Sequence, residues 1–121
     1  EIGGRYSSLL KSVLTSDSSV LTPFISEGNT SVYAQYTLRV KNRDDLATQL
    51  KNHGIPCAVY YPKCLHEQPA FAFCNYHWGD FPESEKASRE VLSLPMHPYL
   101  SEADLVTIVR AVQLASVESC A

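Results

Sequence analysis

The segment from Ser31 to Tyr61 constrains the fold most, because it predicts a strand, a helix and a strand in close succession. In SVYAQYTLRV (31–40), apolar side chains alternate with polar or aromatic ones, a pattern typical of a half-buried strand. Residues 42–52 carry the apolar stripe of a helix, and Gly54 suits its C-terminal cap. IPCAVYY (55–61) then predicts a second strand, so these residues form a compact crossover unit with a right-handed connection.

Amphipathic helices are also predicted at the two ends of the chain. Apolar residues recur on one helical face between Ile2 and Val13. Near the other end, Ser101 and Asp104 form a capping pair in front of a closing helix that frays after Ala115. A short helix over 66–73, a helix opened by Asp80 and a short edge strand over 92–96 fill the interval. These elements predict an α+β domain in which a short sheet carries helices mainly on one face.

Composition excludes several classes of protein. The 121 residues are 45% hydrophobic, which is enough for one domain with an ordinary core. The formal net charge is −3 and no run of Lys or Arg occurs, so a nucleic-acid partner is not expected. No apolar stretch reaches the length of a membrane span, and no leader pattern is seen, so we expect no membrane partner and a cytoplasmic location.

VYYPKCLHEQPAFAFCNYH (59–77) is the stretch richest in chemically active side chains. Cys64, His66, Cys74 and His77 could supply four zinc ligands, although the one-residue spacing of the first pair is unusual for structural zinc. His66 could alternatively serve as the base for a Cys64 nucleophile, but no glycine-rich oxyanion loop accompanies them. The two cysteines could equally be small packed groups, and we expect reduced thiols at all four cysteines, including Cys57 and Cys120.

The same stretch also suits the rim of a binding pocket. Aromatic side chains with hydrogen-bonding tips, together with His66 and Gln68, provide the surface that a sugar or nucleotide edge requires. Core packing is the simpler explanation for Phe71 and Phe73. The five glycines form neither a dinucleotide-binding nor a Walker motif, and no carboxylate pair stands out among the thirteen acids.

Several ordered pieces of the chain resemble one family. YAQYTLRV, GIPCAVYYPKCLHEQPAF, FPESEKASREVLSLPMHP and the closing helix look like the C-terminal part of the DegT/StrS family of sugar aminotransferases. The resemblance covers roughly Arg5 to Gln113, and the order and spacing of the pieces make it specific. The most similar branch acts on UDP-linked N-acetylated keto sugars of surface polysaccharides.

The resemblance implies the small C-terminal domain of an aspartate-aminotransferase-like fold. The parent enzyme would use pyridoxal phosphate to transfer an amino group from glutamate or glutamine to a nucleotide-linked keto sugar, as a homodimer. The cofactor lysine would belong to a large domain that this chain lacks. Residues 1–15 are then expected to be the end of a helix linking the two domains, and residues 16–121 the small domain, inactive by itself.

The resemblance also implies which side chains face the substrate. Relatives often have His-Tyr-Pro and then Leu-His after the second strand; here Tyr60 replaces the first histidine, whereas Tyr61 and His66 match. We therefore expect Tyr60 and His66 to contact the sugar, with Gln68 and Tyr61 as further candidates, and no catalytic, cofactor-binding or metal-binding residue in this chain. The alternatives are a free-standing binding or regulatory module and a small Cys/His zinc-binding domain.

Overall fold

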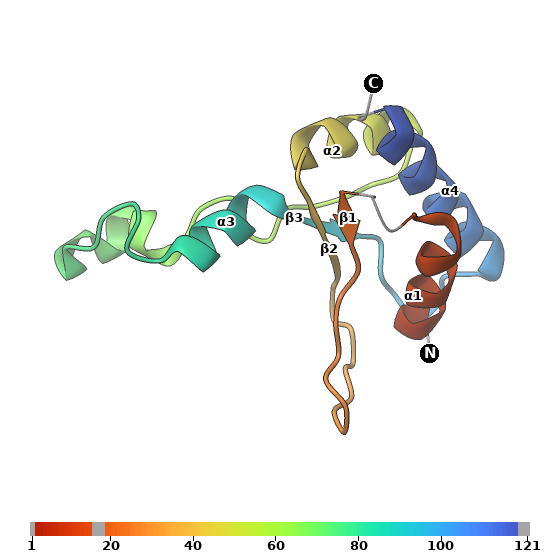
Figure 1. Ribbon diagram of the computed structural model, residues 1–121, viewed down its shortest axis with the longest axis horizontal. Helices are drawn as coiled ribbons and strands as arrows, with labels where there is room; N and C mark the ends of the chain where they lie inside the picture. Colours follow the sequence, from red (N-terminus) through yellow and green to blue (C-terminus); the bar gives the residue numbers. More distant parts are fainter. Residues whose placement is uncertain (1, 16–18, 119–121) are drawn as a thin grey trace.

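The computed structural model describes residues 2–15 and 19–118, and within them a small antiparallel sheet carries three helices on one face (Figure 1). Strand β2 (Tyr36–Val40) lies between β1 (Val20–Leu21) and β3 (Val91–Leu94). The helices are α1 (Ile2–Val13), α2 (Arg43–Asn52) and α4 (Glu102–Glu118). This arrangement confirms the predicted α+β class. Residues 16–18 of the predicted polar loop and the end of the chain, with Cys120, lie outside the described residues.

The core lies between the sheet and these helices. Alternate residues of β2 face it, as the period-two pattern predicts, and the closing helix contributes its apolar stripe. The largest fully buried side chains come from every layer: Tyr6, Tyr36, Leu10, Leu38, Leu46, Leu50, Leu92 and Val112. The Tyr6 and Tyr36 rings stack with centroids 4.7 Å apart, and the Tyr6 hydroxyl donates to the Pro95 carbonyl at 2.8 Å. A fully packed core of this kind sets the orientation of every strand.

The first predicted strand is shorter than its pattern indicates. Pairing with β3 begins only at Tyr36, while Val32 is 94% exposed and Tyr33 has a positive φ of 47°. The alternation over 31–35 therefore lies in the long loop between β1 and β2, which extends away from the sheet in Figure 1. Alternation alone cannot distinguish a strand from an extended loop, because a strand also requires a partner.

The predicted second strand, 55–61, is reduced to one bridge. Ala58 and Ser93 exchange two backbone hydrogen bonds of 3.1 and 2.8 Å in antiparallel sense. Since β3 is antiparallel to both β2 and this bridge, the chain at Ala58 runs parallel to β2, with β3 between them. The prediction of a short edge strand over 92–96 is confirmed in kind, since β3 is an edge strand of the three-stranded sheet, although it spans Val91–Leu94 and its outer side carries the Ala58 bridge.

Residues 60–90, here called the arm, leave the sheet after this bridge and return to it through β3. The arm contains η1 (Leu65–Glu67), η2 (Pro69–Cys74) and α3 (Pro82–Glu90), and it extends far from the core in Figure 1. Its root is held by charged side chains: Arg39 donates to the Glu90 carboxylate at 2.7 and 3.1 Å, and Arg43 donates to the Ser88 and Val91 carbonyls. At the other end of the chain, α4 continues to Glu118, three residues beyond Ala115, and the rest of the tail predicted to fray lies outside the described residues.

Two neighbouring glycines of α1 provide a matched test of this packing. A Cβ at Gly3 would lie 2.3 Å from the Tyr33 ring, whereas a Cβ at Gly4 would meet nothing within 4 Å. We expect Gly3→Ala to destabilise the fold by about 1–3 kcal/mol through overpacking. Gly4→Ala should stabilise it by up to about 1 kcal/mol, because alanine favours the helix. Urea unfolding would measure both, and equal effects of the two variants would contradict the close contact with Tyr33.

Candidate functional site

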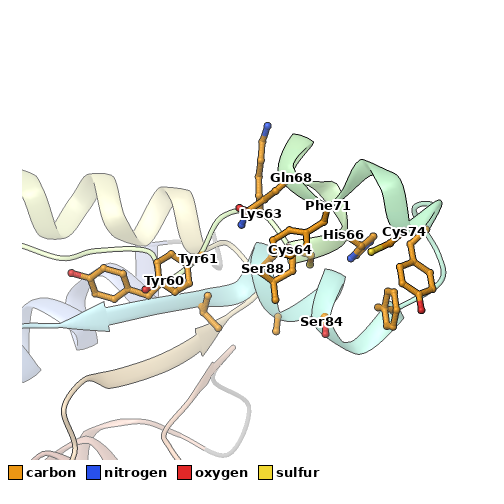
Figure 2. Close-up of a pocket in the computed structure, with 15 residues that line it drawn as sticks. Tyr60, Tyr61, Lys63, Cys64, His66, Gln68, Phe71, Cys74, Ser84 and Ser88 are labelled. Carbon is orange, nitrogen blue, oxygen red and sulfur yellow. The ribbon is translucent and has the colours of Figure 1, made fainter.

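The arm encloses a pocket of about 530 Å³ between its η segments and α3. All four side chains predicted to face a substrate, Tyr60, Tyr61, His66 and Gln68, line it. Figure 2 shows the two tyrosines beside β3 at the root of the arm, while His66 and Cys74 come from the outer η segments. The predicted residues are thus brought together on one concave surface, which is the arrangement that a small-molecule site requires.

Aromatic groups dominate the walls of this pocket. Phe71, Tyr76 and Phe81 line it together with the two tyrosines, and the Tyr76 and Phe81 rings pack edge to face at 4.9 Å. Phe71, for which core packing was the simpler prediction, instead lies partly exposed in the pocket wall. Lys63 is the one Lys or Arg side chain in the lining that the structure describes. The surface is therefore suited to a ring that carries a few polar groups.

Glu85 holds the two sides of the arm together. Its Oε1 accepts hydrogen bonds from the Gly79 N–H at 2.8 Å, the Phe81 N–H at 3.2 Å and His66 Nε2 at 3.1 Å. The side chains of His66 and Glu85 are only 6% and 4% exposed. Because a carboxylate only accepts, the Nε2 atom of His66 carries the proton in this contact. His66 therefore lines the pocket while its Nε2 is committed to Glu85.

Sequence reasoning missed Glu85 because nothing distinguished it from the other acids. The usable signal is its position in α3. Glu85 lies three residues before Ser88, so both side chains are on the same, buried face of the helix. It also lies in the first helical turn, where a carboxylate can accept from free N–H groups. An acidic residue on the inward face of a helix indicates a buried partner.

Tyr60 contributes to a second pocket as well. This pocket of about 340 Å³ lies beside β3 and is lined by residues that include Gln35, Cys57 and Met96. Tyr60 therefore separates the cavity within the arm from a cavity against the sheet. A change at this one side chain would reshape both.

The cysteines do not form a zinc site among the described residues. No three His, Cys, Asp or Glu side chains come together within 2–15 and 19–118. Cys57, Cys64 and Cys74 form no disulfide among the described residues. Cys64 is buried, and burial raises the pKa of its thiol, so little thiolate is available for nucleophilic attack.

The described residues do not fit pyridoxal phosphate by themselves. That cofactor is held through a lysine in a formed pocket with charged partners. Here all five lysines, Lys11, Lys41, Lys51, Lys63 and Lys86, are exposed, and Lys63 alone lies at the pocket. No step of a reaction through the cofactor can be assigned to these side chains. The part of the chain that the structure describes also contains no helix long and apolar enough to span a membrane.

Comparison with known proteins agrees with the fold and the motifs. Residues 1–113 match the DegT/DnrJ/EryC1/StrS aminotransferase family, and the chain belongs to this family. It is 47% identical over 91 residues to the UDP-2-acetamido-2-deoxy-3-oxo-D-glucuronate aminotransferase of Pseudomonas aeruginosa, covering 75% of this chain and 24% of that protein. It is 46% identical over 93 residues to a pleiotropic regulatory protein of Geobacillus stearothermophilus, covering 77% and 25%.

Solved structures show the same relationship. A DegT/DnrJ/EryC1/StrS aminotransferase from Brucella abortus superposes with a TM-score of 0.80 at 42% identity, covering 95% of this chain and 29% of that one. The aminotransferase TlmJ from Streptoalloteichus hindustanus gives a TM-score of 0.81 at 31% identity, covering 99% and 31%. The chain thus spans about a quarter of the length of the curated relatives and under a third of these structures.

Thiol reactivity tests the geometry of the pocket walls. In a Cys120→Ser background, we expect iodoacetamide at about pH 8 to modify exposed Cys74 at least about tenfold faster than Cys64, whose burial limits both access and ionisation. Peptide mass spectrometry after timed quenching measures each site. In urea the two rates should converge, which serves as the control. Equal rates in the native chain would contradict the burial of Cys64.

Proposed function

We propose that this chain is the small domain of a pyridoxal-phosphate-dependent nucleotide-sugar aminotransferase. One observation supports this most strongly: the four residues expected to face the sugar come together on one pocket in a chain that belongs to an aminotransferase family. The cofactor supplies the electron sink. The residues of this domain bind and orient the substrate.

Tyr60, Tyr61 and Gln68 are the proposed substrate contacts. The tyrosine rings provide flat apolar surface and hydroxyl groups, and Gln68 provides an amide that can both donate and accept, as recognition of a polar ring requires. The proposed substrate is a UDP-linked, N-acetylated keto sugar, on the basis of the name of the P. aeruginosa relative. Glutamate or glutamine is the proposed amino donor.

The remaining features of the proposal follow from the family resemblance. We propose that residues 1–15 belong to a helix that links this domain to a cofactor-binding domain, and that residues 16–121 form the small domain. The proposed enzyme is a cytoplasmic homodimer that supplies amino sugars for surface polysaccharides. Isolated, the 121-residue chain neither retains the cofactor nor transaminates.

The first test is whether the isolated chain binds the cofactor. Because its lysines are exposed and none has a cofactor cradle, we expect no stoichiometric absorption band of bound pyridoxal phosphate after dialysis. The full-length P. aeruginosa relative, treated identically, is the positive control. A band that survives dialysis in stoichiometric amount would sink the proposal that the cofactor site lies elsewhere.

The second test is a chimera. The segment of the P. aeruginosa relative that matches this chain is replaced by this chain, and transfer of the amino group from glutamate to that enzyme's own keto sugar is measured. We expect kcat/KM within about tenfold of the parent. A chimera that is dimeric and retains the cofactor but forms no amino sugar would refute the proposed function.

Within the chimera, Tyr60→Ala should raise KM about tenfold or more, because it removes a wall shared by both pockets, while the cofactor absorption stays unchanged. Tyr99→Ala is the matched control, since Tyr99 is 89% exposed and lines neither of these two pockets. Equal KM values for the two variants would show that Tyr60 does not contact the substrate.

A further inference from the structure

The pocket in the arm lacks the support of the main core. Among the described residues, the buried core cluster includes none of the arm's aromatic side chains. Neither η1 nor η2 contains a buried residue. Several large apolar side chains of the arm are instead exposed, among them Tyr61, Phe73 and Trp78. Something other than apolar packing must therefore hold the two sides of the arm at the separation that forms the pocket.

Glu85 is placed to do this, because its donors come from both sides of the arm. His66 belongs to η1 on the outgoing side, whereas Gly79 and Phe81 belong to the turn that opens α3 on the returning side. The three donors converge on a single carboxylate oxygen, and the His66 ring also packs against Phe81 at 5.0 Å between centroids. Hydrogen bonds to a buried carboxylate are roughly twice as strong as those between neutral groups.

The turn itself requires this carboxylate. Gly79 has a φ of 101°, a conformation that glycine adopts without steric cost, and its N–H donates to the Glu85 carboxylate. Phe81 is the N-cap residue of α3 and has no side-chain cap of its own. Without Glu85, both N–H groups would lose the partner that they have in the structure.

We propose that Glu85 is the positioning residue of this pocket: it joins the two sides of the arm and orients the His66 ring, so that the aromatic lining is formed before a ligand binds. His66 then acts through Glu85, as a wall of the pocket whose Nε2 is already bonded, rather than by donating that proton to a substrate. The consequence for substrate recognition rests on the proposed function, whereas the role of Glu85 in the arm does not.

The decisive experiment uses the 121-residue chain and compares Glu85→Gln with Glu83→Gln. Glutamine keeps the shape of Glu85 but offers a neutral oxygen, and Glu83 is an exposed acid in the same helical turn. In Glu85→Gln we expect amide hydrogen exchange at Gly79 and Phe81 to accelerate about tenfold, and the slowly exchanging imidazole N–H signal of His66 to be lost. The Ser93 amide, bonded to Ala58 in the sheet, should keep its wild-type protection.

Each outcome decides the proposal. Unchanged exchange at Gly79 and Phe81 would overturn it, as would identical behaviour of the two variants. Loss of Ser93 protection together with the others would also overturn it, because Glu85 would then support the whole fold rather than the pocket. Acceleration confined to the arm supports it.

The functional consequence is measured in the chimera described above. Glu85→Gln should raise KM about tenfold with kcat within about twofold, since a loosened pocket binds less tightly but leaves the chemical step intact. Glu83→Gln should change neither constant. If the unsubstituted chimera is inactive, the proposed function fails while the exchange result still stands. If Glu85→Gln lowers kcat and leaves KM unchanged, the positioning role is refuted.

Discussion

The pairing of Ser93 with Ala58 is the constraint on which the rest of the molecule depends. Both backbone hydrogen bonds of Ser93 go to Ala58. Ser93 and Thr37 of β2 therefore form a non-hydrogen-bonded pair of the ladder, and their side-chain hydroxyls lie 2.8 Å apart. Ser93 therefore connects the segment around Ala58 to the central strand, β2. The arm begins two residues after Ala58 and ends directly before β3, so this bridge holds its two roots close together.

Hydrogen bonds from two arginines, rather than a hydrophobic core, hold the arm at its root. Arg39 reaches from β2 to Glu90, and Arg43 reaches from α2 to the Ser88 carbonyl of α3 and the Val91 carbonyl at the start of β3. Arg43 is almost fully buried, which makes these bonds to carbonyl groups stronger than surface contacts. With the inner end of α3 held by two arginines and its outer turn bonded to Glu85, the helix is fixed at both ends. Figure 2 shows how the pocket lies along the side of this helix.

Local pattern predicted most of the helices and the class of fold. The stripe of α1 and the Ser101–Asp104 cap of α4 are local features, and local features survive in the structure. Strand boundaries did not follow from pattern, because Val32 alternates correctly but has no partner strand, and the segment around Ala58 pairs through one residue. For the site, motif order identified the four lining residues, but the partner of His66 lies nineteen residues away on another element, and no spacing rule connects them.

The separation of the pocket from the core has an evolutionary consequence. Side chains such as Tyr61 and Phe71 line the pocket but contribute nothing to the buried cluster that stabilises the sheet. Their replacement therefore costs little folding free energy, so selection can change what the pocket recognises while the fold remains intact. The opposite holds for Glu85, whose replacement would alter the shape of the pocket itself. A lining residue can be replaced, but the Glu85 carboxylate, which joins the two sides of the arm, must be kept for any new lining to have a defined shape.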